Sequence, residues 1–71
     1  YACLETMPWH EKKVRAWLRS HDGGEAIVKT RDKTVDPDII SKRLRGTGSC
    51  VYTLFILRMD RKVRVWITQR I

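Results

Sequence analysis

Three cations at alternating positions are the residues of this chain best suited to hold an anion. Lys29, Arg31 and Lys33 follow directly on the apolar pair Ile27 and Val28. Cations at the end of an ordered strand are positioned for contacts with phosphate oxygens. No element of the predicted fold needs positive charge there, so these three residues form the sharpest binding hypothesis in the sequence.

A second alternating set lies near the C-terminus, where Arg64, Trp66, Thr68 and Arg70 are spaced two residues apart. In a strand this spacing places them on one face. Aromatic rings stack on bases and guanidinium groups meet phosphates, so the set predicts a nucleic-acid platform. The alternative is that Trp66 and Phe55 form a second small core or dock against another part of the protein, because exposed large rings need a partner.

A third basic cluster consists of Lys42, Arg43 and Arg45. It lies at the end of a predicted helix, where cations favour the macrodipole and the last carbonyls. This cluster therefore has a structural explanation, and we predict no site from it.

Composition limits the function of the chain. Its 71 residues form one domain with a thin core, which leaves little room for an enclosed catalytic pocket. Fifteen Lys and Arg against eight Asp and Glu give a formal charge of +7, which favours phosphate-bearing partners. No phosphate loop, zinc-protease motif or nucleophile elbow is present. We therefore predict no catalytic residue and no independent enzyme.

Neither cysteine predicts a metal site or a redox centre. Cys3 and Cys50 are far apart, without a C-x-x-C motif, and His10 and His21 occur singly. We expect two reduced, packed thiols, which favours a cytoplasmic protein. No apolar run approaches the ~20 residues that cross a bilayer, so no membrane partner is expected. The oligomeric state is left open.

Apolar periodicity and turn residues divide the chain into six segments in the order β-α-β-α-β-β. Strands are predicted over residues 1–6, 25–31, 50–59 and 62–71. The first is ended by Pro8, and a helix over 10–20 is stopped by Gly23 and Gly24 in a left-handed conformation. The second helix is capped by Asp36 with Pro37 at its first position. Its predicted buried stripe is Ile39, Ile40 and Leu44.

The last two strands predict a hairpin with Asp60 and Arg61 as its two-residue loop. This register pairs residue 56 with 65 and 54 with 67 on an aliphatic face, and 55 with 66 and 57 with 64 on the other. Both helices could cover the aliphatic face, although a one-residue slip would exchange the faces. The predicted fold class is α/β (α+β), a two-layer sandwich with two helices on one face of a mixed sheet.

Three stretches of the sequence together resemble one known family. They are V-R-A-W-L-R at 14–19, I-V-K-T-R at 27–31, and V-D-P at 35–37 continuing to K-R-L-R at 42–45. The family is the THUMP-like C-terminal domain of bacterial class I S-adenosylmethionine-dependent methyltransferases. The resemblance extends to Leu4-Glu5 and to T-L-F-I-L-R at 53–58, and so covers nearly the whole chain. In one departure, Asp32 stands where that family commonly has glycine, and its charge would weaken phosphate binding by Arg31.

The resemblance implies that residues 1–71 are a single accessory domain excised from the C-terminus of a larger methyltransferase. A missing N-terminal domain would bind S-adenosylmethionine and perform the transfer, and this chain would hold no cofactor itself. By analogy with THUMP domains it would help to bind RNA or another substrate. The alternative is a structural module that docks on the catalytic domain or forms a dimer.

Overall fold

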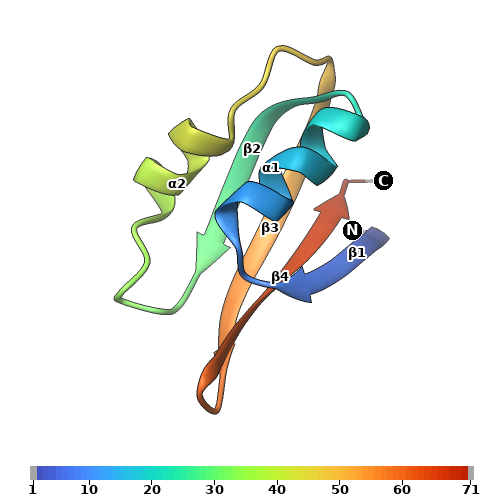
Figure 1. The fold of residues 1–71 in the computed structure, drawn as a ribbon. Coiled ribbons are helices and arrows are strands. Elements are labelled where there is room, and N and C mark those ends of the chain that lie inside the picture. The colour runs from blue at the N-terminus through green and yellow to red at the C-terminus, as the bar shows by residue number, and fades with distance from the viewer. Residues whose placement is uncertain (1, 71) are drawn as a thin grey trace.

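A four-stranded sheet carries two helices on one of its faces (Figure 1). The computed structural model describes residues 2–70. Its elements are β1 (Ala2–Pro8), α1 (Glu11–Ser20), β2 (Gly23–Thr30), α2 (Pro37–Leu44), β3 (Cys50–Met59) and β4 (Lys62–Gln69). The strand order is β1-β4-β3-β2, with β2 parallel to β3 and the other pairs antiparallel. The predicted element order and mixed two-layer architecture are confirmed.

The β3–β4 hairpin has the predicted register. Met59 pairs with Lys62, which leaves Asp60 and Arg61 as the loop, and Asp60 adopts a left-handed φ of 57°. Aspartate is among the few residues that tolerate this conformation. All four predicted pairs are observed: Leu54 with Ile67, Ile56 with Val65, Phe55 with Trp66, and Leu57 with Arg64.

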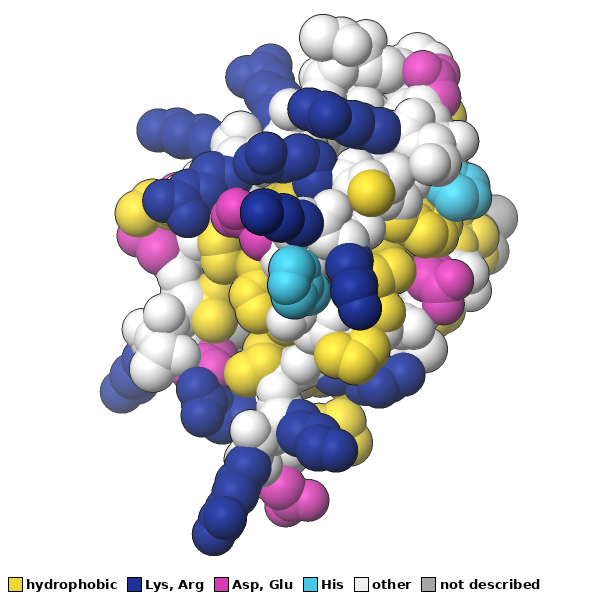
Figure 2. Space-filling model, in the orientation of Figure 1, with side chains coloured by type: hydrophobic (Ala, Val, Ile, Leu, Met, Phe, Trp, Pro, Cys, Tyr) yellow, Lys and Arg dark blue, Asp and Glu magenta, His cyan; other side chains and the backbone are white. Residues whose placement is uncertain are grey.

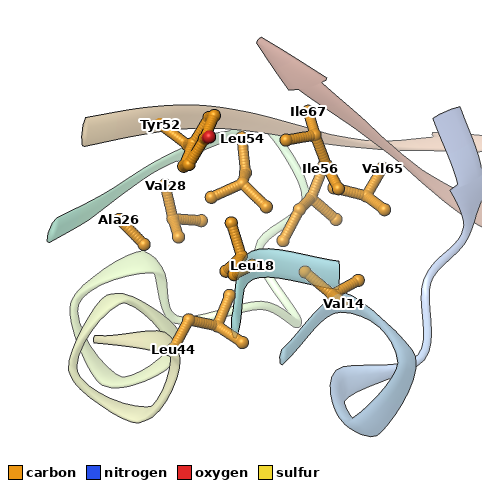
Figure 3. Close-up of a cluster of buried hydrophobic side chains, with 10 residues drawn as sticks. All are labelled: Val14, Leu18, Ala26, Val28, Leu44, Tyr52, Leu54, Ile56, Val65 and Ile67. Atoms are coloured by element: carbon orange, nitrogen blue, oxygen red, sulfur yellow. The ribbon is translucent and has the colours of Figure 1, made fainter. Parts of the chain in front are cut away.

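The core lies between the helices and the aliphatic face of this hairpin (Figure 3). Val14 and Leu18 of α1 and Leu44 of α2 point toward the sheet, as the one-sided apolar spacing of α1 requires. Trp9 and Trp17 are partly buried and pack against this core. The fully buried side chains of the sheet are Leu54, Ile56, Val65 and Ile67.

The end of α1 differs from the prediction. The left-handed residue is Asp22, with φ 56°, whereas Gly23 and Gly24 belong to β2. Gly24 instead permits a close approach of the 46–48 loop, because a Cβ there would lie 2.2 Å from the Gly48 carbonyl oxygen. A Cβ on Gly23 would lie 2.7 Å from the Leu18 carbonyl oxygen of α1. Gly46 N–H donates to Gly24 O at 2.8 Å and thereby joins this loop to β2.

The predicted cap of α2 is confirmed, but its buried stripe is narrower than predicted. The Asp36 carboxylate accepts the backbone N–H groups of Asp38 and Ile39 at 3.0 and 3.3 Å. Ile39 is 50% exposed, which makes its prediction as a buried residue wrong. Ile40 and Leu44 are four residues apart and lie on the same helix side, while Ile39 is rotated by about 100° from Ile40.

The first strand also runs further than predicted. It continues through Pro8, because β1 is an edge strand and loses no essential ladder bond there. A register shift between Cys3 and Glu5 interrupts its pairing with β4. Both cysteines are free, but Cys3 is exposed, so the expectation of a packed thiol is wrong at that position; Cys50 is half-buried.

Leu54→Ala should lower the free energy of unfolding by about 2–5 kcal/mol, because Leu54 is fully buried and its truncation leaves a cavity. The matched control is Leu57→Ala on the same strand, where the side chain is 38% exposed and faces away from the helices. Urea unfolding of both variants measures the difference. Equal destabilisation would contradict the one-sided core.

Candidate nucleic-acid interface

The face of the sheet opposite the helices carries two aromatic rings in one cross-strand row. Lys29 of β2 pairs with Phe55, Phe55 with Trp66, and Trp66 with Thr6 of β1. Phe55 and Trp66 are half-buried, so part of each ring is accessible. The fold therefore brings two of the predicted binding residues, Lys29 and Trp66, into one row across the sheet.

Arg64 lies one row closer to the hairpin loop, between Leu57 and Pro8. Its Nε donates to Thr6 Oγ1 at 2.9 Å, and that hydroxyl donates to the Val65 carbonyl at 3.2 Å. Thr6 thus holds the guanidinium beside the aromatic row. Sequence reasoning missed Thr6, since its role depends on the β1–β4 pairing and the register shift within β1.

Arg31 and Lys33 reach this face from the loop after β2. Together with Trp66 they line an open hollow of about 670 Å³ at the hairpin end of the sheet. Both are exposed. The other lining residues are Asp32, Leu57, Arg58 and Met59. The strand-end cluster and the aromatic platform, which the sequence predicts separately, therefore form one surface, which we call the open-face site.

Local hydrogen bonds fix the loop that presents these cations. Thr30 Oγ1 accepts the Asp32 N–H at 3.0 Å, and the Asp32 carboxylate accepts both the N–H and the hydroxyl of Thr34, at 3.0 and 2.7 Å. Arg58 Nε donates to the same carboxylate at 3.0 Å. The charge of Asp32, which the sequence suggests would oppose phosphate binding, is therefore paired with Arg58.

These contacts lower the pKa of Asp32 below its ordinary value. The hydrogen bond from the Thr34 hydroxyl is the largest cause, followed by the Thr34 N–H and by Arg58. The carboxylate consequently stays ionised at neutral pH and keeps its partners. The loop is held in its conformation by charge as well as by backbone geometry.

Arg70 lies apart from the other predicted residues. It lines a second hollow with Ile27, Val51 and Thr53, at the opposite end of the sheet from Arg31. It follows Trp66 by four residues, a distance of roughly 13 Å along an extended strand. The fold therefore does not place Arg70 beside the aromatic row.

The open face is more apolar than its alternating cations suggest. Several large hydrophobic side chains on it are substantially exposed, which is the signature of a surface that meets a partner. These residues are Ile27 at 40%, Val51 at 45%, Leu57 at 38% and Met59 at 56%. An apolar surface with cations at its margin suits flat rings with attached phosphates, and also an apolar protein surface with acidic margins.

The described residues contain no group of three or more His, Cys, Asp or Glu that could hold a metal ion. Burial raises the pKa of Tyr52, whose hydroxyl donates to the His21 carbonyl at 2.6 Å. That bond anchors the end of α1 to the sheet. Within residues 2–70, neither helix is long and apolar enough to span a bilayer.

Comparison with known proteins gives one match. A family model described as THUMP domain-like matches residues 1–70. Neither the curated proteins nor the solved structures contain a match to this chain.

Thr34→Val should raise the pKa of Asp32 toward its ordinary value, because it removes the largest cause of the depression and leaves the backbone N–H and Arg58. A depressed pKa stabilises the fold above the carboxyl's unfolded pKa, and this stability is lost as pH falls through the folded pKa. The variant should therefore lose stability at neutral pH relative to the wild type, with the difference vanishing in acid.

Carboxyl NMR titration measures this shift. Asp22 is the internal control, because its lowered pKa comes from Ser49 and not from Thr34. An Asp32 pKa that stays unchanged in Thr34→Val would show that the hydroxyl contact does not govern the loop.

Proposed function

The chain belongs to the THUMP domain-like family, and on that premise we propose that it is an RNA-binding accessory domain of a cytoplasmic S-adenosylmethionine-dependent methyltransferase. The observation that supports RNA binding is the open-face site. There Trp66 and Phe55 lie in one cross-strand row with Lys29, and Trp66 shares a hollow with Arg31 and Lys33. Rings and cations are thus neighbours on a surface that no helix of residues 2–70 covers.

This arrangement favours unpaired bases over a rigid duplex. Stacking requires bases splayed out of a helix, so that they reach aromatic side chains lying on a sheet. Trp66 and Phe55 would supply the stacking surfaces, while Lys29, Arg31 and Lys33 would neutralise the adjoining phosphates. Arg64, held by Thr6, adds a fixed guanidinium next to the rings. The net charge of +7 would speed encounter with a polyanion.

Methyl transfer would belong to another domain of the same protein, which would bind S-adenosylmethionine. The support is the resemblance of the segments at 14–19, 27–31 and 35–45 to the methyltransferase-linked form of the family. We assign no residue of this chain to the methyl donor. A glycine-rich S-adenosylmethionine-binding loop in residues upstream of Tyr1 would support this assignment. If the full protein has no such loop, the assignment to a methyltransferase is rejected.

The second candidate function is docking on the catalytic domain or formation of a dimer. The specific observation in its favour is the exposed apolar set of the open face, above all Met59 and Val51. In this function Phe55 and Trp66 would lie in a dry interface. The cations at its margin would contact acidic residues of the partner.

Trp66→Ala should weaken binding of a single-stranded RNA by roughly 5- to 150-fold, since stacking of one base contributes about 1–3 kcal/mol. Trp66→Phe keeps a ring at the position and should restore most of the affinity. Fluorescence anisotropy with a labelled oligonucleotide measures both. Size-exclusion chromatography and cross-linking of the same variants measure whether their assembly changes.

The two candidate functions predict opposite outcomes for this variant. Unchanged RNA affinity together with loss of a dimer, or of contact with the catalytic domain, would reject RNA stacking and support docking. Weakened RNA binding with unchanged assembly would reject docking by Trp66.

Lys29→Ala with Arg31→Ala should reduce the salt dependence of RNA binding. Each lost phosphate contact of a single strand lowers the slope of log K against log salt by about 0.7, so two contacts lower it by about 1.4. The matched control is Lys12→Ala with Lys13→Ala, which removes the same charge from exposed positions of α1. If both double variants changed the slope equally, the change would reflect net charge alone. That result would contradict a binding site at Lys29 and Arg31.

A further inference from the structure

A hollow of about 630 Å³ lies between the C-terminal ends of α1 and α2 and the loop at residues 46–48. It belongs to the helix-covered side of the molecule, away from the open-face site. Figure 2 shows this side, with dark blue Lys and Arg side chains gathered over the upper ends of the helices. Four arginines are among the residues that line the hollow: Arg15, Arg19, Arg43 and Arg45.

Arg19 lies in the last turn of α1, where a cation favours the helix macrodipole. Carbonyls near this helix end have other hydrogen-bond partners: Ser20 Oγ donates to Ala16 O at 3.0 Å, and His21 N–H donates to Leu18 O at 3.2 Å. The His21 ring nitrogen Nδ1 lies 2.8 Å from Trp17 O. The Arg19 guanidinium makes no hydrogen bond to these three carbonyls.

Arg15 and Arg43 have a structural role that does not use all of their hydrogen-bond donors. Arg15 Nη2 donates to the Arg43 carbonyl at 3.0 Å, and Glu11 lies 3.5 Å from Arg43 and 4.0 Å from Arg15. These contacts join α1 to α2. Within the described range, however, the Nε of Arg15 is buried and has no hydrogen-bond partner. A buried donor without an acceptor is costly.

Cationic side chains in and around the hollow outnumber the carboxylates there, even when every ion pair is counted. Glu11 offsets one cation. Asp22, the carboxylate lining the hollow, is bound by Ser49 Oγ at 2.6 Å, and this hydrogen bond lowers its pKa, so it stays ionised. The side chains of Arg19 and Arg45 make no ion pair or hydrogen bond with residues 2–70. Two of the four arginines that line the hollow thus have no ion-pair partner among residues 2–70, and Asp22 is the one carboxylate in the described lining.

We propose that this hollow binds a phosphate group, with Arg19 and Arg45 as its main ligands. The planar fork of a guanidinium matches two phosphate oxygens at once, which a lysine ammonium cannot do. Thr47, which also lines the hollow, offers a hydroxyl. The site is separate from the open-face site and does not depend on the proposed function.

The test titrates the 71-residue chain with inorganic pyrophosphate and follows it by calorimetry and by amide NMR shifts at residues 46–48. Arg19→Gln with Arg45→Gln should weaken pyrophosphate binding by at least tenfold. Both side chains are exposed and unpaired within the described structure, so the double variant should fold, which its thermal unfolding checks. If that variant is unstable, Arg45→Gln alone should still weaken binding severalfold.

The matched control is Lys13→Gln with Arg61→Gln, which removes the same charge from exposed positions outside the hollow. Equal weakening by the control, or no binding of pyrophosphate to the wild-type chain, would overturn the proposal. Competition identifies the source of the phosphate. Displacement of pyrophosphate by an RNA oligomer without terminal phosphates indicates a backbone phosphate, and resistance to that oligomer indicates a small phosphate compound. Trp66→Ala should leave pyrophosphate binding unchanged whether or not the open face binds RNA.

Discussion

The two helices cover only one face of the sheet, and the rest of this structure depends on that constraint. A chain of 71 residues provides two helices, of ten and eight residues, which pack on the face that carries Leu54, Ile56, Val65 and Ile67. Side chains alternate between faces along each strand, so the same register directs Phe55, Leu57, Arg64 and Trp66 to the uncovered side. A core and an open apolar surface are therefore two results of one constraint.

The hairpin register was predictable because the two-residue loop and the aliphatic alternation both specify it. Asp60 tolerates the left-handed turn, and any one-residue slip would expose Ile56 and Val65. The end of α1 was mispredicted because Asp22, not a glycine, adopts the positive φ. Gly24 is explained by a loop whose Gly46 contacts it from 22 residues away in sequence, a contact that no local pattern encodes.

The candidate site was predictable by residue type but not by arrangement. The alternating spacing in the sequence identifies two separate sets of candidate residues: Lys29, Arg31 and Lys33, and then Trp66 and Arg70. Only the parallel pairing of β2 with β3 places the first set next to Trp66. The same pairing separates Arg70 from them. Thr6 and the Asp32–Arg58 pair escaped prediction because each unites residues more than 25 positions apart.

Two cationic surfaces on opposite sides of one sheet imply different ligands, because their apolar content differs. The open-face site combines cations with exposed Leu57, Met59 and a half-buried Trp66, so that desolvation of rings would add to charge pairing. The hollow at the helix ends offers guanidinium groups and backbone, and its lining holds no aromatic residue. Its affinity would depend on charge and geometry and would fall as the salt concentration rises. A ligand rich in rings therefore fits the open face, and a compact phosphate fits the hollow.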